Sequence, residues 1–233
     1  MPCMLLSVLA VVIVALAFLA VTVTLRDRVA LRRVVEGPAP AWRDDLPPEV
    51  AALARRGMAG AEAPATAIRL AQHAEMVLRP GGPWEPMSAR QAIAAGRPAF
   101  AWLAVQPLGP LPKVRVLDAY DPERGGRLLV RLLGAVPMAA QRGAAMDRGE
   151  AMRYLAELPW APDAIAGNRA LTWEVLAEDR LRVSTDTPAG PASVELLLDA
   201  AGDVTGIEAE RPVDLPGGGT EVRAWRGRFS DHA

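Results

Sequence analysis

Side chains that bind metals or attack substrates are scarce in this chain. Its 233 residues include one cysteine, Cys3, and two histidines, His73 and His232. A zinc site built from cysteine and histidine is therefore excluded, and so is a disulfide within the chain. We interpret His73 as a solvent-facing strand residue and His232 as a frayed terminal one, and no Gly-x-Ser-x-Gly motif offers a serine nucleophile. The sequence predicts neither a metal site nor a cofactor.

Patterns for binding phosphate or nucleic acid are also missing. No G-x-x-x-x-G-K-[ST] loop occurs, and no G-x-G-x-x-G follows a predicted strand. Lys113 is the only lysine, and 22 basic and 26 acidic side chains remain once the four arginines and one aspartate of 26–33 are set aside. This acidic balance leaves no basic patch, so we expect no nucleic-acid partner.

The first clear positive feature is an apolar run without any charge over residues 4–25. A helix of roughly 20 such residues crosses the ~30 Å hydrocarbon core of a bilayer. We predict a single transmembrane helix over residues 1–25, with a cleaved secretory signal as the alternative. Four arginines between 26 and 33 follow the run, and no basic residue precedes it. This asymmetry favours a soluble domain on the cytoplasmic side, while the side stays open.

The rest of the chain divides by composition. Residues 26–48 combine basic residues with Gly37, Pro38, Pro40, Pro47 and Pro48, which indicates a basic stalk and a proline-rich linker. Residues 49–233 are long enough for a single domain with a real core. Hydropathy alternates with a period of two over several stretches of this segment, among them 66–78, 113–120 with 127–136, and 171–229.

Short turns separate these strands, so antiparallel neighbours are expected. Helices are predicted at 48–57, 87–95 and 147–158. We predict an α+β fold in which one curved, half-barrel-like antiparallel sheet of eight or nine strands is covered by a few helices. In the helix at 147–158, Asp147 and Glu150 match a capping box, so we interpret Glu150 as a cap and Glu157 as a surface charge.

Several stretches together resemble an uncharacterised bacterial family that is known only as a domain of unknown function. Its signature here is Gly-Glu-x-x-Arg-Tyr-Leu-Ala-Glu-x-x-Trp, over residues 149–160. The other stretches that carry the resemblance are Pro162, Trp84–Met87 with Gln91, Phe100–Trp102, Asp118–Tyr120, Arg131–Gly134, Trp173 and Gly227–Asp231. The resemblance covers about residues 46–231 and implies no activity, cofactor or catalytic residue.

Two further expectations come from the same resemblance. Relatives often begin with a hydrophobic segment, in agreement with the anchor. They typically continue past the Gly-Arg-Phe-Ser-Asp stretch with another strand pair, which implies that the sheet here lacks its last strands. The exposed edge could then pair with a partner protein or the membrane. A truncated reading frame is the alternative.

Three functional hypotheses follow. The first is a membrane-anchored binding module for an apolar small molecule or lipid, motivated by a long curved sheet, six tryptophans and no catalytic set. The residues expected to line its cavity, with an ordinary core as the alternative for each, are Trp102, Tyr120, Tyr154, Trp160 and Trp173. The second is a hydrolase that uses Glu150, Asp118 and Arg153. The third is a structural or interaction protein of the cell envelope. We favour binding over catalysis.

Overall fold

The computed structural model describes residues 2–77, 81–109, 111–215 and 218–230. Within residues 1–17 it describes the side chains of Ser7, Val11, Val14 and Ala15 alone, and the side chain of Asp214 is also outside it. His232 lies outside the described residues. His73 is exposed on a strand, as predicted.

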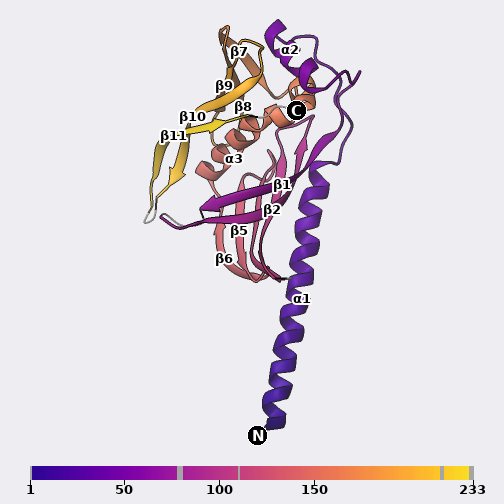
Figure 1. Ribbon diagram of the computed structural model, residues 1–233, viewed down its shortest axis with the longest axis vertical. Coiled ribbons are helices and arrows are strands. Elements are labelled where there is room, and N and C mark those ends of the chain that lie inside the picture. The colour runs from indigo at the N-terminus through magenta and orange to yellow at the C-terminus, as the bar shows by residue number, and fades with distance from the viewer. Residues whose placement is uncertain (1, 78–80, 110, 216–217, 231–233) are drawn as a thin grey trace.

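Two antiparallel sheets form the body of the molecule (Figure 1). The six-stranded sheet has the order β1-β2-β3-β4-β5-β6. Its strands are β1 (Ala67–Val77), β2 (Trp84–Ala94), β3 (Phe100–Leu108), β4 (Leu111–Tyr120), β5 (Arg127–Leu132) and β6 (Val136–Gln141). The five-stranded sheet has the order β11-β10-β9-β8-β7. Its strands are β7 (Thr172–Ala177), β8 (Arg180–Thr185), β9 (Ala192–Leu198), β10 (Val204–Asp214) and β11 (Thr220–Arg228).

The α+β class is confirmed, but the expectation of one curved sheet is wrong. The chain leaves the first sheet after β6 and enters a helical segment before the second sheet begins at β7. That segment contains α3 (Ala144–Ala156), the 3-10 turn η1 (Leu158–Trp160) and α4 (Pro162–Gly167). Helix α3 contacts β4 and β5 of one sheet and β8, β9 and β10 of the other, so it lies between the two sheets. Short turns within each sheet gave no sign of this division.

The helix expected at 87–95 is also wrong, because residues 87–94 belong to β2. They pair with β1 in an uninterrupted register that runs from Ala67↔Ala94 to Val77↔Trp84. Met87, Ala89 and Gln91 are buried, and the residues between them are exposed. The long pairing with β1, together with one covered face, overrides the helix propensity of Ala, Gln and Arg.

Helix α3 confirms the helix expected at 147–158, with a start three residues earlier. Its N-terminal neighbour is Gly143, and no side chain caps the helix. Asp147 lies in the first turn, where its Oδ1 accepts a hydrogen bond from Gly126 N at 2.7 Å. The predicted capping box is therefore wrong, because Asp147 ties α3 to the loop before β5 instead. This frees Glu150 for a different role.

The main core lies where α3, α4 and the inner faces of both sheets meet. Its largest fully buried side chains include Tyr120, Tyr154, Phe100, Leu155 and Ile165. Helix α2 (Pro48–Gly57) packs against α4 so closely that a Cβ atom on Gly57 would come within 2.7 Å of Pro162 Cβ. Glycine at this position permits the contact.

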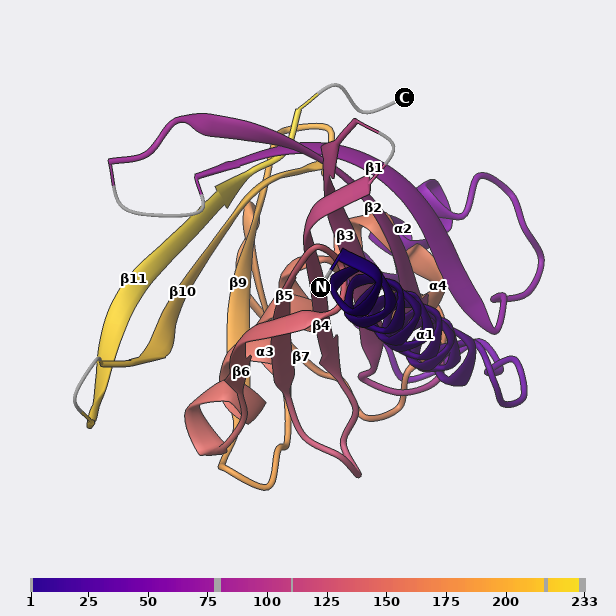
Figure 2. The same ribbon diagram turned by 90° about the horizontal axis from the view of Figure 1, so that it is seen from below.

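Helix α1 (Pro2–Val34) runs along the outer face of the six-stranded sheet and then continues past the sheet's end (Figures 1 and 2). Its last turns pack on small side chains of β2, β3 and β4. This second cluster contains Ala30, Val34, Ala92, Ala94, Ala99, Ala101, Leu117 and Ala119. No helix among the described residues is long and apolar enough to cross a membrane, so the transmembrane helix expected at 1–25 gains no support here.

A buried ion cluster fixes α1 to this face. Asp27 is completely buried. Its Oδ1 lies 3.2 Å from Arg131 Nη1, and its Oδ2 lies 3.6 Å from Arg115 Nη1. Arg115 also donates a hydrogen bond of 2.8 Å to Thr24 Oγ1. Arg115 and Arg131 are cross-strand partners on β4 and β5, so the contacts hold one turn of α1 against two neighbouring strands.

Candidate functional site

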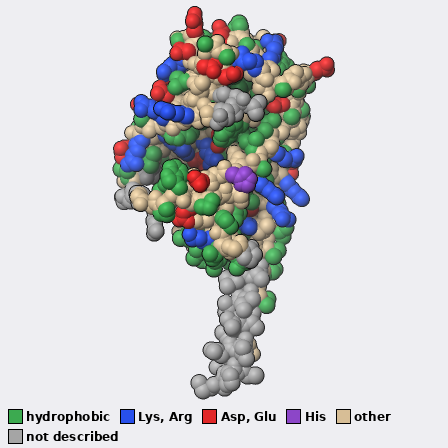
Figure 3. All heavy atoms as spheres, in the orientation of Figure 1, with side chains coloured by type: hydrophobic (Ala, Val, Ile, Leu, Met, Phe, Trp, Pro, Cys, Tyr) green, Lys and Arg blue, Asp and Glu red, His purple; other side chains and the backbone are tan. Residues whose placement is uncertain are grey.

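A cavity of about 840 Å³ lies between the inner face of the six-stranded sheet, helix α3 and the β10–β11 hairpin. Figure 3 shows a hollow on one face of the molecule, with charged side chains in its depth. The sheet contributes Met76, Trp102, Val116, Asp118, Leu128 and Gln141. Helix α3 and the turn after it contribute Met146, Gly149, Glu150, Arg153, Glu157 and Trp160. The hairpin and its continuation contribute Ile207, Arg211, Trp225 and Phe229. Most of this lining is apolar.

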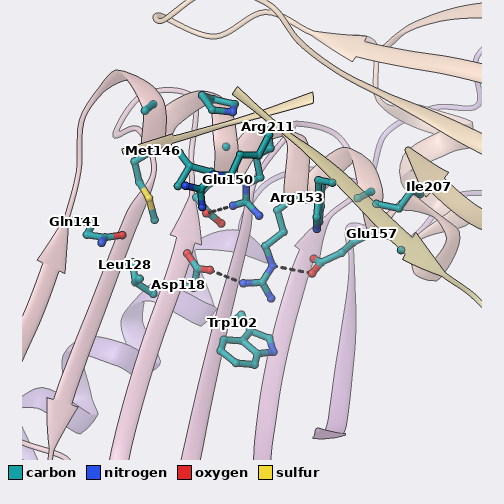
Figure 4. A pocket seen from close by; sticks show the side chains of 18 of the residues that line it. Trp102, Asp118, Leu128, Gln141, Met146, Glu150, Arg153, Glu157, Ile207 and Arg211 are labelled. Carbon is teal, nitrogen blue, oxygen red and sulfur yellow. Dashed lines mark hydrogen bonds and ion pairs between the residues drawn. The ribbon is translucent and has the colours of Figure 1, made fainter. Parts of the chain in front are cut away.

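Arg153 is the centre of the polar part of the lining (Figure 4). Its Nη1 donates to Asp118 on β4, and its Nε donates to Glu157 Oε1 at 2.8 Å, one turn further along the chain. The guanidinium carbon lies 4.9 Å from the ring centre of Trp102 and 5.0 Å from that of Phe100. Burial acts to lower the pKa of Arg153, but the carboxylates of Glu157, Asp118 and Glu150 outweigh it and raise the pKa. Arg153 is therefore a fixed cation with two carboxylate partners.

A row of amides extends this network along the six-stranded sheet. Gln91 on β2 donates to Glu157 and accepts a hydrogen bond of 3.0 Å from Gln72 on β1. Gln72 in turn accepts a hydrogen bond of 2.8 Å from Trp102 Nε1. Glu157 is buried, so its interpretation as a surface charge is wrong. The two glutamines thus provide hydrogen-bond partners for the Glu157 carboxylate and the Trp102 indole, which lie away from bulk water.

Glu150 is held beside Asp118 on the same side of Arg153. Only 2 % of Glu150 is exposed. Its Oε1 accepts a hydrogen bond of 2.6 Å from Arg211 Nη2 on β10. Burial, and next the negative charge of Asp118, raise the pKa of Glu150 to about 8 despite Arg211 and Arg153. Glu150 is therefore neutral over most of the physiological range.

The remaining carboxyl oxygens support this protonation. Glu150 Oε2 and Asp118 Oδ1 are buried and lack a hydrogen-bond partner among the described residues. A proton on Glu150 lets its carboxyl group donate to Asp118, which gives both oxygens a partner. Two neighbouring buried carboxyl groups that share one proton avoid the repulsion of two like charges. The interpretation of Glu150 as a helix cap is wrong, because its side chain is buried in the fold and bonds to Arg211.

Arg211 reaches Glu150 because the facing position on α3 is a glycine. A Cβ atom on Gly149 would lie 3.2 Å from Arg211 Nε. The guanidinium carbon of Arg211 lies 4.9 Å from the ring centre of Trp225 on β11. The hairpin therefore supplies a cation with one carboxyl partner and one aromatic face.

The structure brings five of the residues expected at a site into this one cavity: Asp118, Glu150, Arg153, Trp102 and Trp160. It places the other three in packed surroundings outside the cavity lining. Burial, together with the nearby Asp147 carboxylate, raises the pKa of Tyr120 to about 12. Tyr154 donates a hydrogen bond of 3.0 Å to Ala94 O and accepts one from Asn168. Trp173 is partly buried against the main core.

Sequence reasoning missed Glu157, Gln91, Arg211 and Trp225. Glu157 stands four residues after Arg153, and this spacing alone indicates an ion pair on a helix. No signal in the sequence connects Arg211 with Glu150, because the contact depends on how the second sheet folds over α3. Among the described residues, no group of three or more His, Cys, Asp and Glu side chains could hold a metal ion.

A family model described as a family of unknown function, DUF6544, matches residues 39–233. The chain belongs to this family. The match includes both sheets, α3 and every residue of the cavity lining, and it begins after α1. The resemblance to a domain of unknown function is thus confirmed. No curated protein and no solved structure matches the chain.

Proposed function

We propose that this chain is a membrane-anchored binding protein for a largely apolar small molecule or lipid. The observation that carries the proposal is the cavity of about 840 Å³ with mostly apolar walls and one polar network. Ligand pockets have volumes of about 300–1,000 Å³ and combine apolar walls with a few placed polar groups. The apolar side chains of Leu128, Ile207 and Met146 would contact the body of the ligand, and Arg211 with Glu150 would orient its polar end.

The anchor is the second part of the proposal. Residues 4–25 contain no charged side chain, and α1 continues beyond the body of the molecule. A binding protein for poorly soluble molecules gains from attachment to the surface where they concentrate. The four arginines after the apolar run favour a cytoplasmic domain at a cell membrane.

The test of binding uses the full chain, purified in detergent and examined by native mass spectrometry. The wild type is expected to retain a co-purified lipid or apolar adduct. Leu128→Trp adds an indole to the cavity wall and is expected to lose the adduct. Val175→Trp, on an exposed face of β7, is the matched control and should keep it. A wild-type chain that carries no adduct and binds no added dodecanol would refute the proposal.

A hydrolase stays the second candidate, because one observation favours it. Glu150 has a pKa of about 8 and stands beside the carboxylate of Asp118 in the cavity. A protonated carboxyl group next to an ionised one is the arrangement of a general acid and its partner. Glu150→Gln separates the two functions. The glutamine oxygen can still accept the hydrogen bond of Arg211 and orient a ligand, so adduct binding should persist, whereas a turnover that requires the proton of Glu150 would be lost. Pairing of a partner protein with the exposed edge strand β11 is a third proposal, consistent with its place at the edge of the described sheet.

A further inference from the structure

Four exposed leucines gather at the end of the six-stranded sheet from which α1 departs. Leu108 and Leu111 face each other where β3 meets β4, and they are 55 % and 61 % exposed. Leu132 and Leu133 follow β5 and are 39 % and 50 % exposed. We name these four residues the tip surface. Exposed large apolar side chains that cluster in this way mark interaction sites.

The two turns that carry these leucines are joined into one unit. Leu133 N donates a hydrogen bond of 2.9 Å to Lys113 O. A Cβ atom on Gly134 would lie 2.7 Å from Pro112 Cγ, so the turns are in close contact. The strand ends that carry the tip surface are therefore in contact, and all four of its leucines are exposed.

Leu133 is held in a backbone conformation that suits a different residue. Its φ is 50°, in the left-handed region where glycine or asparagine is favoured. This conformation is unfavourable for a residue with a Cβ atom. Folding alone does not favour an exposed leucine here, since the polar asparagine would fit the turn better. A function for the apolar side chain accounts for its presence.

The contacts of α1 show on which side this surface lies. Arg115 and Arg131 bind Thr24 and Asp27, which places these helix residues level with the middle of β4 and the C-terminal end of β5. Leu111 is four residues before Arg115, so it lies ~13 Å further along the strand. Arg97, near the other end of the sheet, binds Arg33 O and Asp121. The tip surface therefore extends in the direction of the N-terminus of α1.

The same direction leads into the apolar part of α1. Residues 2–23 of the helix rise ~33 Å, the thickness of a hydrocarbon core. The exposed Arg26 and Arg28 stand at the level where this run ends, and cations at that level suit anionic lipid phosphates. The leucines of the tip surface lie beyond these arginines, on the side of the apolar run.

We propose that the tip surface dips into the boundary between headgroups and acyl chains of the bilayer that holds α1, as a second membrane contact. This inference rests on the proposed membrane anchoring. The proposed partner of the tip surface is a lipid bilayer. Contact of both α1 and the tip surface with the same bilayer would fix the orientation of the domain relative to the membrane. The domain then cannot swing freely about the end of α1.

The test measures the depth of single labels in a membrane. The full chain with Cys3→Ser receives one cysteine in place of Leu133, Val14 or Val175, is labelled with bimane and is reconstituted into phosphatidylcholine–phosphatidylglycerol vesicles. Lipids with a spin label close to the headgroup or deep in the acyl chain quench the label by contact. We expect shallow lipids to quench position 133 and deep lipids to quench position 14. Position 175, on β7 at the far end of the molecule, should lose no emission.

The outcomes separate the two proposals. Quenching at 14 without quenching at 133 overturns the tip contact and leaves the anchor in place. Quenching at 133 without quenching at 14 supports the tip contact and refutes the anchor. A second variant guards against misfolding: Leu133→Asn suits the left-handed turn and should not lower the unfolding free energy. It should nevertheless reduce the quenching of a label at Leu111, and unchanged quenching there counts against the proposal.

Discussion

Both faces of the six-stranded sheet bury carboxyl groups beside arginines, but the two clusters differ in the sign of their net charge. On the outer face, one carboxylate, Asp27, lies against Arg115 and Arg131 under a tightly packed helix. On the inner face, Asp118, Glu150 and Glu157 lie against Arg153 and Arg211 beside an open cavity. The outer cluster has an excess of positive charge and joins two elements. The inner cluster has an excess of negative charge, which a proton on Glu150 neutralises.

This difference distinguishes a structural cluster from a candidate site. The outer cluster is covered by alanines and by α1, so its charges serve the docking of the helix. The inner cluster leaves two carboxyl oxygens without a hydrogen-bond partner among the described residues, at the wall of a space large enough for a ligand. Groups with strongly shifted pKa values next to a cavity are characteristic of functional sites.

The largest expected effect comes from removing the cation of the inner cluster. Arg153→Ala leaves Asp118 and Glu157 buried without their partner and deletes the contacts with Phe100 and Trp102. Loss of one partner of a buried ion pair costs about 3–5 kcal/mol. Chemical denaturation of the full chain in detergent measures the change. A loss below that of Arg182→Ala, an exposed ion pair on β8, would contradict this account of the cluster.

An isosteric substitution in the outer cluster should lower unfolding free energy by less than Arg153→Ala does in the inner one. Asp27→Asn keeps a hydrogen-bond acceptor for Arg131 but removes the negative charge between two arginines. We expect a loss of about 1–3 kcal/mol in unfolding free energy. Because burial raises the pKa of Asp27 despite both arginines, the folded chain takes up a proton at this site before the unfolded chain does. Acidification should therefore raise the contribution of this site to unfolding free energy in the wild type and leave that of Asp27→Asn unchanged. Equal stability of the two chains at neutral pH would show that α1 docks without this charge.

The proton on Glu150 predicts an unusual pH dependence. The pKa of Glu150 in the folded chain is about 8, against an ordinary value of 4.5. Between these values the folded state holds a proton that the unfolded state releases. Unfolding free energy at this site therefore falls as pH rises from 4.5 to 8, by up to about 1.4 kcal/mol per pH unit.

Denaturation at a series of pH values measures this slope, and Glu150→Gln provides the control. Glutamine keeps the shape of the neutral carboxyl group and cannot titrate, so the variant should show a flatter profile. Asp118→Asn should shift the profile to lower pH, because it removes the negative charge that raises the pKa of Glu150. Identical slopes in the wild type and Glu150→Gln would rule out the shared proton.

The smallest effect is expected at the glycine that faces Arg211. In Gly149→Ala the new methyl group would lie 3.2 Å from Arg211 Nε, so the guanidinium must move slightly away. The gain of about 1 kcal/mol from alanine in a helix offsets this cost, and stability should change little. The pH of the Glu150 transition should rise, because Arg211 lowers its pKa. The denaturation series detects this shift, and a shift to lower pH would contradict the role given to Arg211.

Local patterns in the sequence were sufficient where neighbours in the chain determine the structure. The β4–β5 hairpin and the helix around Met152 and Leu155 were predicted because their periodicity and turns are local. The strand at 87–94 was missed because its residues favour a helix until β1 pairs with them. The division into two sheets was missed because α3 separates them through contacts distant in sequence.

The candidate site shows the same limit. Asp118, Glu150 and Arg153 could be named from a motif and its carboxylates, yet their roles could not. Glu150 matched a cap because Asp147 precedes it by three residues, whereas the bond of Asp147 to Gly126 and the approach of Arg211 decide its true surroundings. Contacts between the second sheet and α3 have no counterpart in local spacing.

The alanine-rich cluster beneath α1 matters for the choice of chain boundaries in recombinant production of this family. A chain begun at residue 39, where the family match starts, would leave Ala92, Ala94, Ala99, Ala101 and Ala119 facing water beside two arginines that have lost their counter-ion. Expression of that segment by itself invites aggregation through the bared strands. The docked part of α1 from Val23 to Val34 thus belongs to the folded body, and a recombinant chain should begin upstream of it.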